Sequence, residues 1–594
     1  MREKKIWASL HPFFEGGSML GRREANRRFL TALLENDPFD AYHFFLSHPD
    51  VRTALEDELR ALFPDLLRED RISLRLHAEF PAALGEHGYH CLHLSDPFSC
   101  FTEAMCLRNV FSRRIFPITA PTHSLSYAEF GGEFLKHLWG GVTARDAVAA
   151  TSTAGAEVVR AYYARLRDAY ALDEERFAAP SVRCVPLGVD PSLMPAPDEK
   201  RQLGAACRSR LGLGDKLVFL VFARIAYQSK MDLLPVLRAW KRAEEYGMPR
   251  GRCALVLAGW VEDGDTFDKD IAGFAANMGI GCLTVPRPDN AGRKALYAAA
   301  DVFLSPSDNL QETFGLTLLE AAASCLPVIA SDFDGYRDLV SDGESGILVP
   351  IVGPARTPRT DALARIVPAA AYHLMSAQQS AVDVEALGRA IHLLAGDETL
   401  RRRMGETGRQ QVLAGRTWRH VVRNMLDLWA ELNETPCPLP ENPGERRRCA
   451  LVHPSCPPHT DIFSGYYTLR ADDPDLAGKK LVWSKAGKAV YHGRDFPVVY
   501  RPVEEHVDPE TLRKLLFTAR KPTAWAELAA LCAAQTKGPG PSDGEFMLLW
   551  ALKHDFLEFA ASPPGASGQP AGLAPARADW GQGQNRANEC RPEK

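Results

Sequence analysis

The 594-residue chain lacks several features that mark particular classes of protein. No apolar run approaches the roughly 20 residues that span a bilayer. The N-terminus, MREKKIWASLHPFF, has neither the apolar core nor the cleavage site of a signal peptide. A net charge of −5 is small for this length and predicts no nucleic-acid-binding surface. The 13 cysteines form no C-x-x-C pairs, which favours reduced thiols. We therefore expect a cytoplasmic protein, while peripheral contact with the inner face of a membrane stays open.

The first third of the chain alternates strand-like and helix-like segments. The expected strands are residues 5–10, 42–46, 90–94, 115–119, 147–151 and 181–186. Longer charged stretches with helical periodicity lie between several of them. This alternation predicts a mainly parallel sheet covered by helices on both faces. We assign residues 1–195 to a first Rossmann-like domain and expect the charged, Pro-containing stretch after it to connect to a second.

A second alternating unit, assigned to residues 203–414, follows the connection. Its expected strands are residues 217–222, 254–258, 283–285, 302–304 and 327–330. Two such α/β halves in tandem would form a cleft, because open parallel sheets bind ligands at the carboxyl ends of their strands. Residues 383–432 predict a nearly continuous helix. Its last part, near residues 415–434, would cross back to complete the first half.

The remainder of the chain changes character. Residues 435–448 are rich in Pro and charge and predict a linker. Residues 449–560 carry their own large apolar side chains, including Trp483, Trp525 and Trp550, and predict a small α+β domain. Residues 562–594 are dominated by Gly, Pro, Ala and Gln, which predicts a disordered tail.

Residues 301–350 contain the most informative pattern. An apolar strand, a Ser/Pro-marked loop, Glu312, a helix start and then Glu320 follow one another in DVFLSPSDNLQETFGLTLLEAAASC. A helix N-terminus gathers unpaired N–H groups and the positive end of the peptide dipoles, so it can bind a phosphate. Carboxylates on either side can accept hydrogen bonds from hydroxyl groups. Phosphate flanked by hydroxyls is the outline of a sugar nucleotide.

The start of this helix and a preceding strand supply further candidates. We expect Thr313 to be the N-cap, Gly315 to permit close backbone approach, and the N–H groups from Phe314 to Leu316 to face a diphosphate. Arg224 and Lys230 follow the strand at residues 217–222 and suit the negative charge of a diphosphate leaving group. These two cations would make an Asp-x-Asp metal site unnecessary, so no metal cofactor is expected.

Nine segments in register between about residues 115 and 430 resemble the family 4 retaining glycosyltransferases, which have the two-Rossmann-domain fold called GT-B. The segments are THSLSY, VPLGVD, FARIAYQSKMDLL, ALVLAGW, LYAAADVFLSPS, ETFGLTLLEA, LPVIASDFDGYRDLV, DGESGILVP and TWRHVVRNML. The resemblance implies that the first half binds the acceptor and the second half binds the nucleotide sugar.

Roles for single residues follow from the resemblance. It implies that Glu312 binds hydroxyls of the donor sugar, that Glu320 binds the ribose and that His123 contacts the transferred sugar. Gly16 and Gly17 would form a loop that touches phosphate and acceptor. The chain departs from the family in two places. Five residues separate Arg224 from Lys230 where the family more often has four, and Cys325 replaces a usual Gly.

The expected activity is transfer of a hexose, with retention of configuration, from a nucleoside-diphosphate sugar to a saccharide or lipid-linked acceptor. Two alternatives remain open: another GT-B enzyme, such as a sugar-nucleotide epimerase or a phosphorylase, and a non-catalytic carbohydrate-binding scaffold. Residues 449–560 could bind an acceptor or a protein partner. Cys449, His453, Cys456 and His459 are chemically able to bind zinc, but their spacing fits no zinc-finger pattern, so no metal is expected there.

Overall fold

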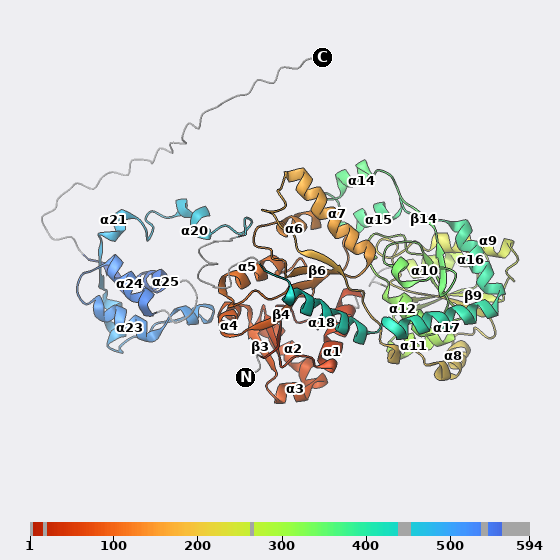
Figure 1. Cartoon of the computed structure of the whole chain (residues 1–594), viewed down its shortest axis with the longest axis horizontal. Coiled ribbons are helices and arrows are strands. Elements are labelled where there is room, and N and C mark those ends of the chain that lie inside the picture. The colour runs from red at the N-terminus through yellow and green to blue at the C-terminus, as the bar shows by residue number, and fades with distance from the viewer. Residues whose placement is uncertain (1–3, 16–20, 262–265, 438–452, 536–543, 561–594) are drawn as a thin grey trace, which may run out of the picture. The chain divides into compact units, whose positions relative to one another are not determined.

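The computed structural model describes residues 4–15, 21–261, 266–437, 453–535 and 544–560 (Figure 1). The chain divides into two compact units, Met1–Pro458 and His459–Lys594. No helix in the described ranges is long and apolar enough to cross a bilayer.

The first unit begins with a seven-stranded sheet in the order β3-β2-β1-β4-β5-β6-β7. All of its strand pairs are parallel. The strands are β1 Ile6–Ser9, β2 Ala41–Leu46, β3 Ile72–Leu76, β4 Tyr89–His93, β5 Ile118–Pro121, β6 Asp146–Ala150 and β7 Ser181–Cys184. Six correspond to expected strands, whereas β3 was not expected.

Helices cover both faces of this sheet. Trp7 and Phe44 point to a core shared with α1 (Gly21–Asn36), α2 (Pro49–Leu62) and α18 (Trp418–Glu434). Ala8 and Phe45, one residue further along the same strands, point to the opposite core, as strand periodicity requires. That core is shared with α4 (Phe80–Glu86), α5 (Phe101–Phe111), α6 (Phe130–Lys136) and α7 (Thr153–Tyr170). The short α3 spans Pro64–Arg68.

A second parallel sheet in the same unit has the order β10-β9-β8-β11-β12-β13. Its strands are β8 Leu217–Phe222, β9 Cys253–Gly259, β10 Cys282–Pro286, β11 Val302–Ser305, β12 Val328–Ser331 and β13 Gly346–Val349. One face is covered by α9 (Leu234–Glu245), α10 (Phe267–Asn277) and α16 (Val384–Gly396). The other face is covered by α8 (Pro197–Arg210), α11 (Asn290–Ala299), α12 (Leu316–Ala323), α13 (Tyr336–Leu339) and α17 (Glu398–Gly415).

The two sheets share a topological feature that positions a ligand site. In each, the strand order reverses direction beside the first strand, between β1 and β4 and between β8 and β11. Ligands of open α/β sheets bind outside the carboxyl ends of the strands at such a switch point. The loops after β8 and β11 are therefore placed to form a site.

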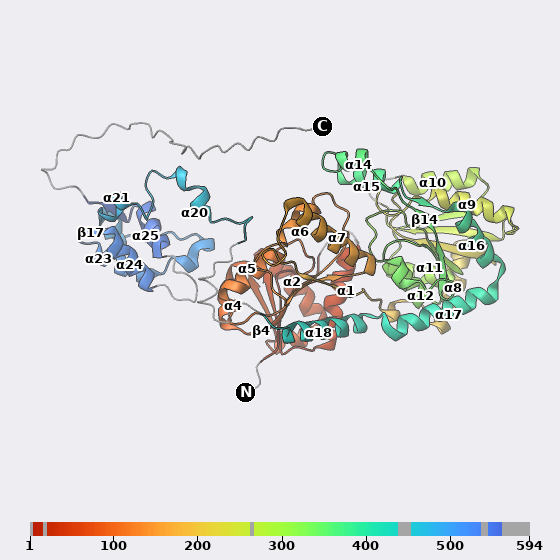
Figure 2. The same cartoon turned by 45° about the horizontal axis from the view of Figure 1, so that its top comes forward.

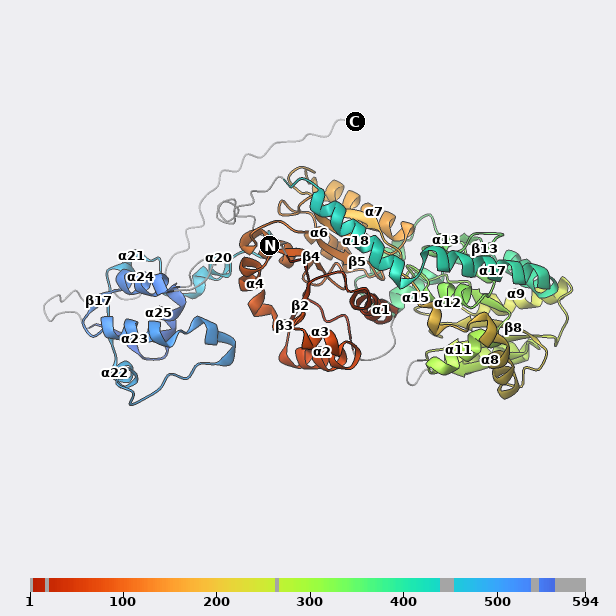
Figure 3. The same cartoon turned by 60° about the horizontal axis from the view of Figure 1, so that its bottom comes forward.

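The stretch over residues 383–432, expected to be a nearly continuous helix, is helical almost throughout but is divided into three helices. Asp397 ends α16 and caps α17 by accepting a hydrogen bond from Leu400 N at 2.8 Å. Thr417, in extended conformation, separates α17 from α18. Helix α17 packs on the second sheet and α18 on the first (Figure 3), where Trp429 Nε1 donates to Thr119 Oγ1 at 2.9 Å. The break between α17 and α18 lets the chain turn from the second sheet back to the first.

The connection between the two sheets also differs from expectation. Pro191–Leu193 forms a 3₁₀ turn and α8 begins at Pro197, so the boundary expected at residue 203 falls inside a helix. Pro at the first helical position favours this start. After β13, strands β14 (Ile351–Val352) and β15 (Ala381–Val382) pair and enclose α14 (Pro358–Leu363) and α15 (Ala369–Ala377), drawn in Figure 2.

The second unit has an α+β fold, as expected. Its antiparallel sheet has the order β17-β16-β18, with β16 Lys480–Trp483, β17 Thr523–Ala524 and β18 Leu557–Phe559. Its helices are α20 His459–Ile462, α21 Pro474–Ala477, α22 Lys485–Tyr491, α23 Pro509–Thr518, α24 Trp525–Gln535 and α25 Gly544–Lys553, with 3₁₀ turns at Ser464–Tyr466 and Arg501–His506. Leu481, Leu515, Trp525 and Leu548 are in its core.

Candidate active site

An ion pair joins the loops that follow β8 and β11. Lys230 Nζ contacts Glu312 Oε2, and the two side chains are only 18% and 11% exposed. Lys230 lies after β8 and Glu312 after β11, and these strands are neighbours in the sheet. The structure thus brings together two residues that are 82 positions apart in the chain.

The extra residue between Arg224 and Lys230 is taken up by a turn. Lys230 N donates to Ala226 O at 3.0 Å, and Lys230 O accepts from Ser307 Oγ at 2.9 Å. Arg224 Nη1 donates to Ser229 Oγ at 3.1 Å within the same loop. Lys230 consequently stays in contact with the β11 loop despite the unusual spacing.

Burial sets the electrostatics of Lys230. Burial, aided by the nearby Arg224, lowers the pKa of Lys230 to about 7, while Asp334 acts in the opposite direction. Burial also raises the pKa of Asp334 to about 7. A buried amine with so low a pKa is sensitive to any added charge, and a phosphate placed beside it would favour the protonated form.

Tyr336 holds Glu312 and was not identified from the sequence. Its hydroxyl donates to Glu312 Oε2 at 3.1 Å and accepts from Ser305 Oγ, 2.8 Å away. The Tyr336 side chain is fully buried, so its hydroxyl needs both partners. In the sequence, Tyr336 is an aromatic residue at the start of α13, and no spacing rule links that position to Glu312.

The start of α12 differs from the expected one. Gly315, rather than Thr313, is the N-cap, with φ of +105°. A Cβ at Gly315 would lie 2.5 Å from Tyr336 Cε1, so both its conformation and the close approach of Tyr336 require glycine. Phe314 is buried in the core beneath this turn. The first N–H groups of α12, which have no acceptor within the helix, therefore begin at Leu316.

Glu320 is buried rather than solvated. It forms an ion pair with Arg293 of α11 and accepts a hydrogen bond from Tyr297 Oη at 2.9 Å. Glu320, Arg293 and Leu316 line a small hollow together with residues of the first half, including Glu24, Arg28, Gly188 and Trp418. Sequence analysis found Glu320 but neither of its two partners.

His123 follows β5 in the first half. Its Nε2 donates to Ser95 O at 2.9 Å. Burial, with a contribution from Arg22, lowers the pKa of His123 to about 4, so the ring is neutral near pH 7. The next residue, Ser124, donates through Oγ to Gln311 O at 2.9 Å. The loop that carries His123 therefore lies against the segment that carries Glu312.

Several buried polar atoms near these residues have no hydrogen-bond partner. Among the described residues they include Gln228 Oε1, Asn309 Nδ2 and Thr317 Oγ1. Gln228 lies in the Arg224–Lys230 loop, Asn309 precedes Glu312, and Thr317 is in the first turn of α12. Because buried polar groups are rarely left unpaired, the unpaired atoms in these three segments favour a polar partner near them.

Not every candidate can be located. Gly16 and Gly17 lie outside the described residues, as does Cys449. His453 Nε2 donates to Lys136 O at 2.7 Å, and its Nδ1 accepts from Ser455 N at 3.1 Å. Within the described ranges, no group of three His, Cys, Asp or Glu side chains is placed to hold a metal ion.

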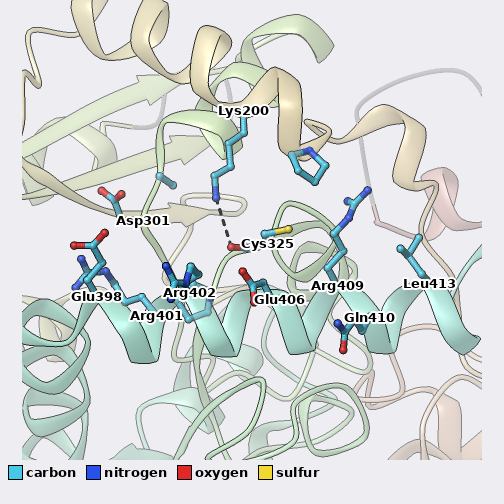
Figure 4. A pocket seen from close by; sticks show the side chains of 13 residues that line it. Lys200, Asp301, Cys325, Glu398, Arg401, Arg402, Glu406, Arg409, Gln410 and Leu413 are labelled. Atoms are coloured by element: carbon cyan, nitrogen blue, oxygen red, sulfur yellow. Dashed lines mark hydrogen bonds between the residues drawn. The ribbon is translucent and has the colours of Figure 1, made fainter.

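A hollow near the C-terminal end of α12 has a structural explanation (Figure 4). Cys325, at the family's usual Gly position, adopts φ of +56° after that helix. Lys200 of α8 donates to Ser324 O at 3.1 Å, and Arg409 of α17 donates to Ala323 O. These cations satisfy the last carbonyls of α12 and stabilise the negative end of its dipole. The lining also includes Arg401, Arg402 and Glu406.

The fold defines the class of the protein. Two parallel Rossmann-like sheets, and a last helix that returns from the second to the first, form the GT-B architecture, as the sequence predicted. Residues 216–359 match the family model described as "Glycosyl transferases group 1". This match spans β8 to β13 and includes Arg224, Lys230, Glu312 and Glu320. The predicted resemblance to glycosyltransferases is confirmed over this part of the chain.

Curated relatives match over part of the chain. A D-inositol 3-phosphate glycosyltransferase of Stackebrandtia nassauensis is 33% identical over 211 residues, which is 35% of this chain and 43% of that protein. A phosphatidyl-myo-inositol mannosyltransferase of Mycobacterium leprae is 47% identical over 62 residues, 10% of this chain and 16% of that protein. The chain thus spans less than half the length of these relatives.

Among solved structures, sucrose-phosphate synthase from Thermosynechococcus elongatus covers 72% of this chain at 20% identity, with 99% of its own chain matched and a TM-score of 0.46. The fold assignment rests on the strand order and helix packing described above rather than on this superposition.

Proposed function

We propose that the protein is a retaining glycosyltransferase of the family 4 type. It transfers a hexose from a nucleoside-diphosphate sugar to a saccharide or lipid-linked acceptor. The observation that carries this proposal is the Lys230–Glu312 pair, held at the switch point of the second sheet beside the N-terminus of α12. A cation, a carboxylate and free helix amides meet there, and a sugar diphosphate needs all three.

Donor binding would replace ion pairs and hydrogen bonds within the protein by contacts with the donor. The diphosphate binds to Lys230, Arg224 and the first amides of α12, because the positive side chains and the helix dipole both favour an anion there. Glu312, released from Lys230 but still held by Tyr336, accepts hydrogen bonds from hydroxyls of the sugar. Glu320 accepts hydrogen bonds from the ribose. The unpaired atoms Gln228 Oε1, Asn309 Nδ2 and Thr317 Oγ1 offer further polar contacts.

The reaction follows from this placement. The acceptor hydroxyl attacks the anomeric carbon from the face on which the diphosphate leaves. The bond from the anomeric carbon to the phosphate oxygen breaks, and the departing phosphate takes the proton of the hydroxyl. Arg224 and Lys230 stabilise the negative charge that grows on the leaving group, so no metal ion is needed. Neutral His123 contacts the sugar from the first half.

The most direct test is a thermal-shift panel of UDP-, GDP- and ADP-sugars. A ligand at 100 times its Kd stabilises the protein by about 2.7 kcal/mol, which gives a clear rise in melting temperature. Product analysis with a radiolabelled donor then follows. Binding without turnover would support a carbohydrate-binding scaffold, and an altered sugar nucleotide without transfer would support an epimerase. A panel without any stabilising ligand would refute the proposal.

Replacing Glu312 by Gln should lower the transfer rate by about 10²-fold, because the carboxylate is lost where the sugar is held. Glu344→Gln, at an exposed carboxylate in the loop before β13, is the matched control and should keep full activity. Both variants are compared by turnover and by circular dichroism. Normal turnover of the Glu312 variant would show that its assigned role is wrong.

We further propose that residues 449–560, of which those from His459 onward belong to the second unit, act as an acceptor-binding or protein-binding module. The protein works in the cytoplasm, with peripheral membrane contact if its acceptor is lipid-linked.

A further inference from the structure

An arm of the second sheet domain, residues 353–380, leaves the core between β14 and β15. The two strands pair, with Ile351 opposite Val382 and Val352 opposite Ala381, so the arm leaves and rejoins the fold at the same place. It carries α14 and α15 (Figures 1 and 2). Because its ends are closed off by this pairing, the second sheet does not need the arm to complete its strand order.

His373 on α15 contacts the loop of the first half that carries His123. Its Nε2 lies 3.0 Å from Ser126 Oγ and 3.3 Å from Ser126 O. Its ring packs edge-on against Tyr127, with ring centroids 5.0 Å apart. Only 1% of His373 is exposed, so these contacts are buried. Ser126 lies three residues after His123.

The same histidine contacts the segment that carries Glu312. Gln311 Nε2 donates to His373 Nδ1 at 2.9 Å and also to Tyr127 Oη at 3.2 Å. Gln311 O accepts from Ser124 Oγ at 2.9 Å. Gln311 immediately precedes Glu312, so one imidazole ring lies between the neighbours of two candidate catalytic residues.

The arm makes a further contact beyond α15. Gln378 Nε2 donates to Asp232 Oδ2 at 3.1 Å, and Asp232 lies two residues after Lys230. Residues within three positions of His123, Glu312 and Lys230 therefore all form hydrogen bonds with the arm.

The hydrogen-bond partners of His373 indicate which of its ring nitrogens carries the proton. Because the Gln311 amide nitrogen can only donate, Nδ1 must accept and Nε2 must carry the proton that Ser126 receives. This is the neutral imidazole, and burial lowers the pKa of His373 in the same sense. With the ring in this form, each hydrogen bond of the His373, Gln311, Ser126 and Tyr127 group has one donor and one acceptor.

We propose that His373 is a positioning residue, through which the arm holds the His123 loop and the Glu312 loop in catalytic alignment. This inference rests on the proposed function, since alignment matters only if the two loops act on one substrate. The hydrogen bonds of His373 go to Ser126 and Gln311, not to the groups assigned to the diphosphate. Its loss should therefore impair turnover much more than nucleotide binding.

The test compares His373→Ala with two conservative variants and a matched control. Asn at 373 can keep the hydrogen bond from Gln311, and Gln can keep the one to Ser126. The control is Gln379→Ala on the same arm, because Gln379 bonds only within the arm, to Thr360 Oγ1 and Met375 O. UDP, GDP and ADP are titrated calorimetrically, and release of nucleoside diphosphate is followed with the sugar nucleotide that stabilises the wild type.

His373→Ala is expected to lower kcat about tenfold while the donor KM and the nucleotide Kd change less than about twofold. Asn or Gln at 373 should restore part of kcat, and Gln379→Ala should match the wild type. Backbone amides of residues 122–127 should exchange hydrogen faster in His373→Ala than in Gln379→Ala. Unchanged kcat would overturn the proposal, as would an equal loss of kcat and nucleotide binding.

Different results would refute the proposed function and the positioning role of His373. If no sugar nucleotide binds or turns over with the wild-type protein, the proposed function is wrong. Hydrogen exchange then still decides whether His373 ties the two loops together, and unchanged exchange would refute that contact.

Discussion

Lys230 is a buried amine in the site proposed to bind a diphosphate. Its pKa of about 7 in the free protein lies far below the ordinary 10.5. Since the folded protein binds fewer protons than the unfolded chain between pH 7 and 10.5, this group makes the folded state more stable as pH rises through that interval. Below about pH 7 the cost of burying the charged amine is fully present.

Nucleotide binding should show the opposite dependence. A diphosphate favours the protonated amine, so the affinity for the stabilising nucleoside diphosphate should fall by up to about tenfold per pH unit above pH 7. Binding at pH 8 should take up a proton, which calorimetry in two buffers of different ionisation enthalpy measures. Lys230→Arg should abolish the uptake, because a guanidinium stays charged. An unchanged proton uptake in that variant would place the titration elsewhere.

The sequence predicted those site residues that belong to short motifs. Spacing within QETFGLTLLE singled out Glu312 and Glu320, and the end of a strand singled out Arg224 and Lys230. Tyr336, Arg293 and His373 could not be found this way. Each acts through a contact made in the folded chain, and His373 is 62 residues from its partner Gln311. Thr313 was wrongly expected as N-cap because the side-chain preference of Thr was weighed above the backbone freedom of Gly315.

The two ends of helix α12 have different surroundings. Its N-terminus is the end proposed to bind the diphosphate, while Lys200 and Arg409 donate hydrogen bonds to carbonyls at its C-terminal end. The residue after its C-cap, Cys325, has φ of +56°, a conformation that costs a side-chain-bearing residue about 1–2 kcal/mol. The functional helix therefore ends at a strained position.

Cys325→Gly should raise the free energy of unfolding by about 1 kcal/mol, since glycine adopts this conformation without strain but gains freedom in the unfolded chain. Ala323→Gly, two residues earlier in helical conformation, should lower it by about 1 kcal/mol or more. Urea denaturation of both variants measures the two effects. A lower free energy of unfolding in both variants would mean that packing of the half-buried Cys325 thiol stabilises the fold by more than the backbone strain destabilises it.

Strand positions were predictable because buried parallel strands form short apolar runs, and the residues around 217–222 are an example. Within the two parallel sheets, two strands were not predicted. Strand β3, ISLRL, carries a charge and is largely half-buried, and β13, GILV, lies in a Gly-rich return. The stretch over residues 383–432 was expected to be a nearly continuous helix, and its division into three helices was not predicted. Side-chain capping by Asp397 depends on local geometry that periodicity does not report.

For the whole molecule, the division at Pro458 separates two bodies with separate cores. Within the first unit, His453 is anchored to Lys136 O and packs its ring 5.0 Å from Trp139. A chain that ends at Pro458 should therefore retain the fold of the first unit and its nucleotide affinity.

Scanning calorimetry of the shortened and full chains checks this expectation. The full chain should show one additional transition, and the transition shared by both should keep its midpoint. An insoluble shortened chain, or one without nucleotide affinity, would show that the second unit is part of the first unit's fold.

The position of α18 has a consequence for biosynthesis. The first sheet buries Trp7 and Phe29 against Trp418, Val422 and Trp429, which are among the last described residues of the first unit. During translation, the amino-terminal sheet emerges from the ribosome well before the helix that seals it. The part of its apolar face that α18 covers, beside α1 and α2, stays exposed from the completion of β7 at Cys184 until Trp418 and the rest of α18 have been made, roughly 230 residues later. The nascent chain therefore passes through a long interval in which chaperones have a defined surface to protect.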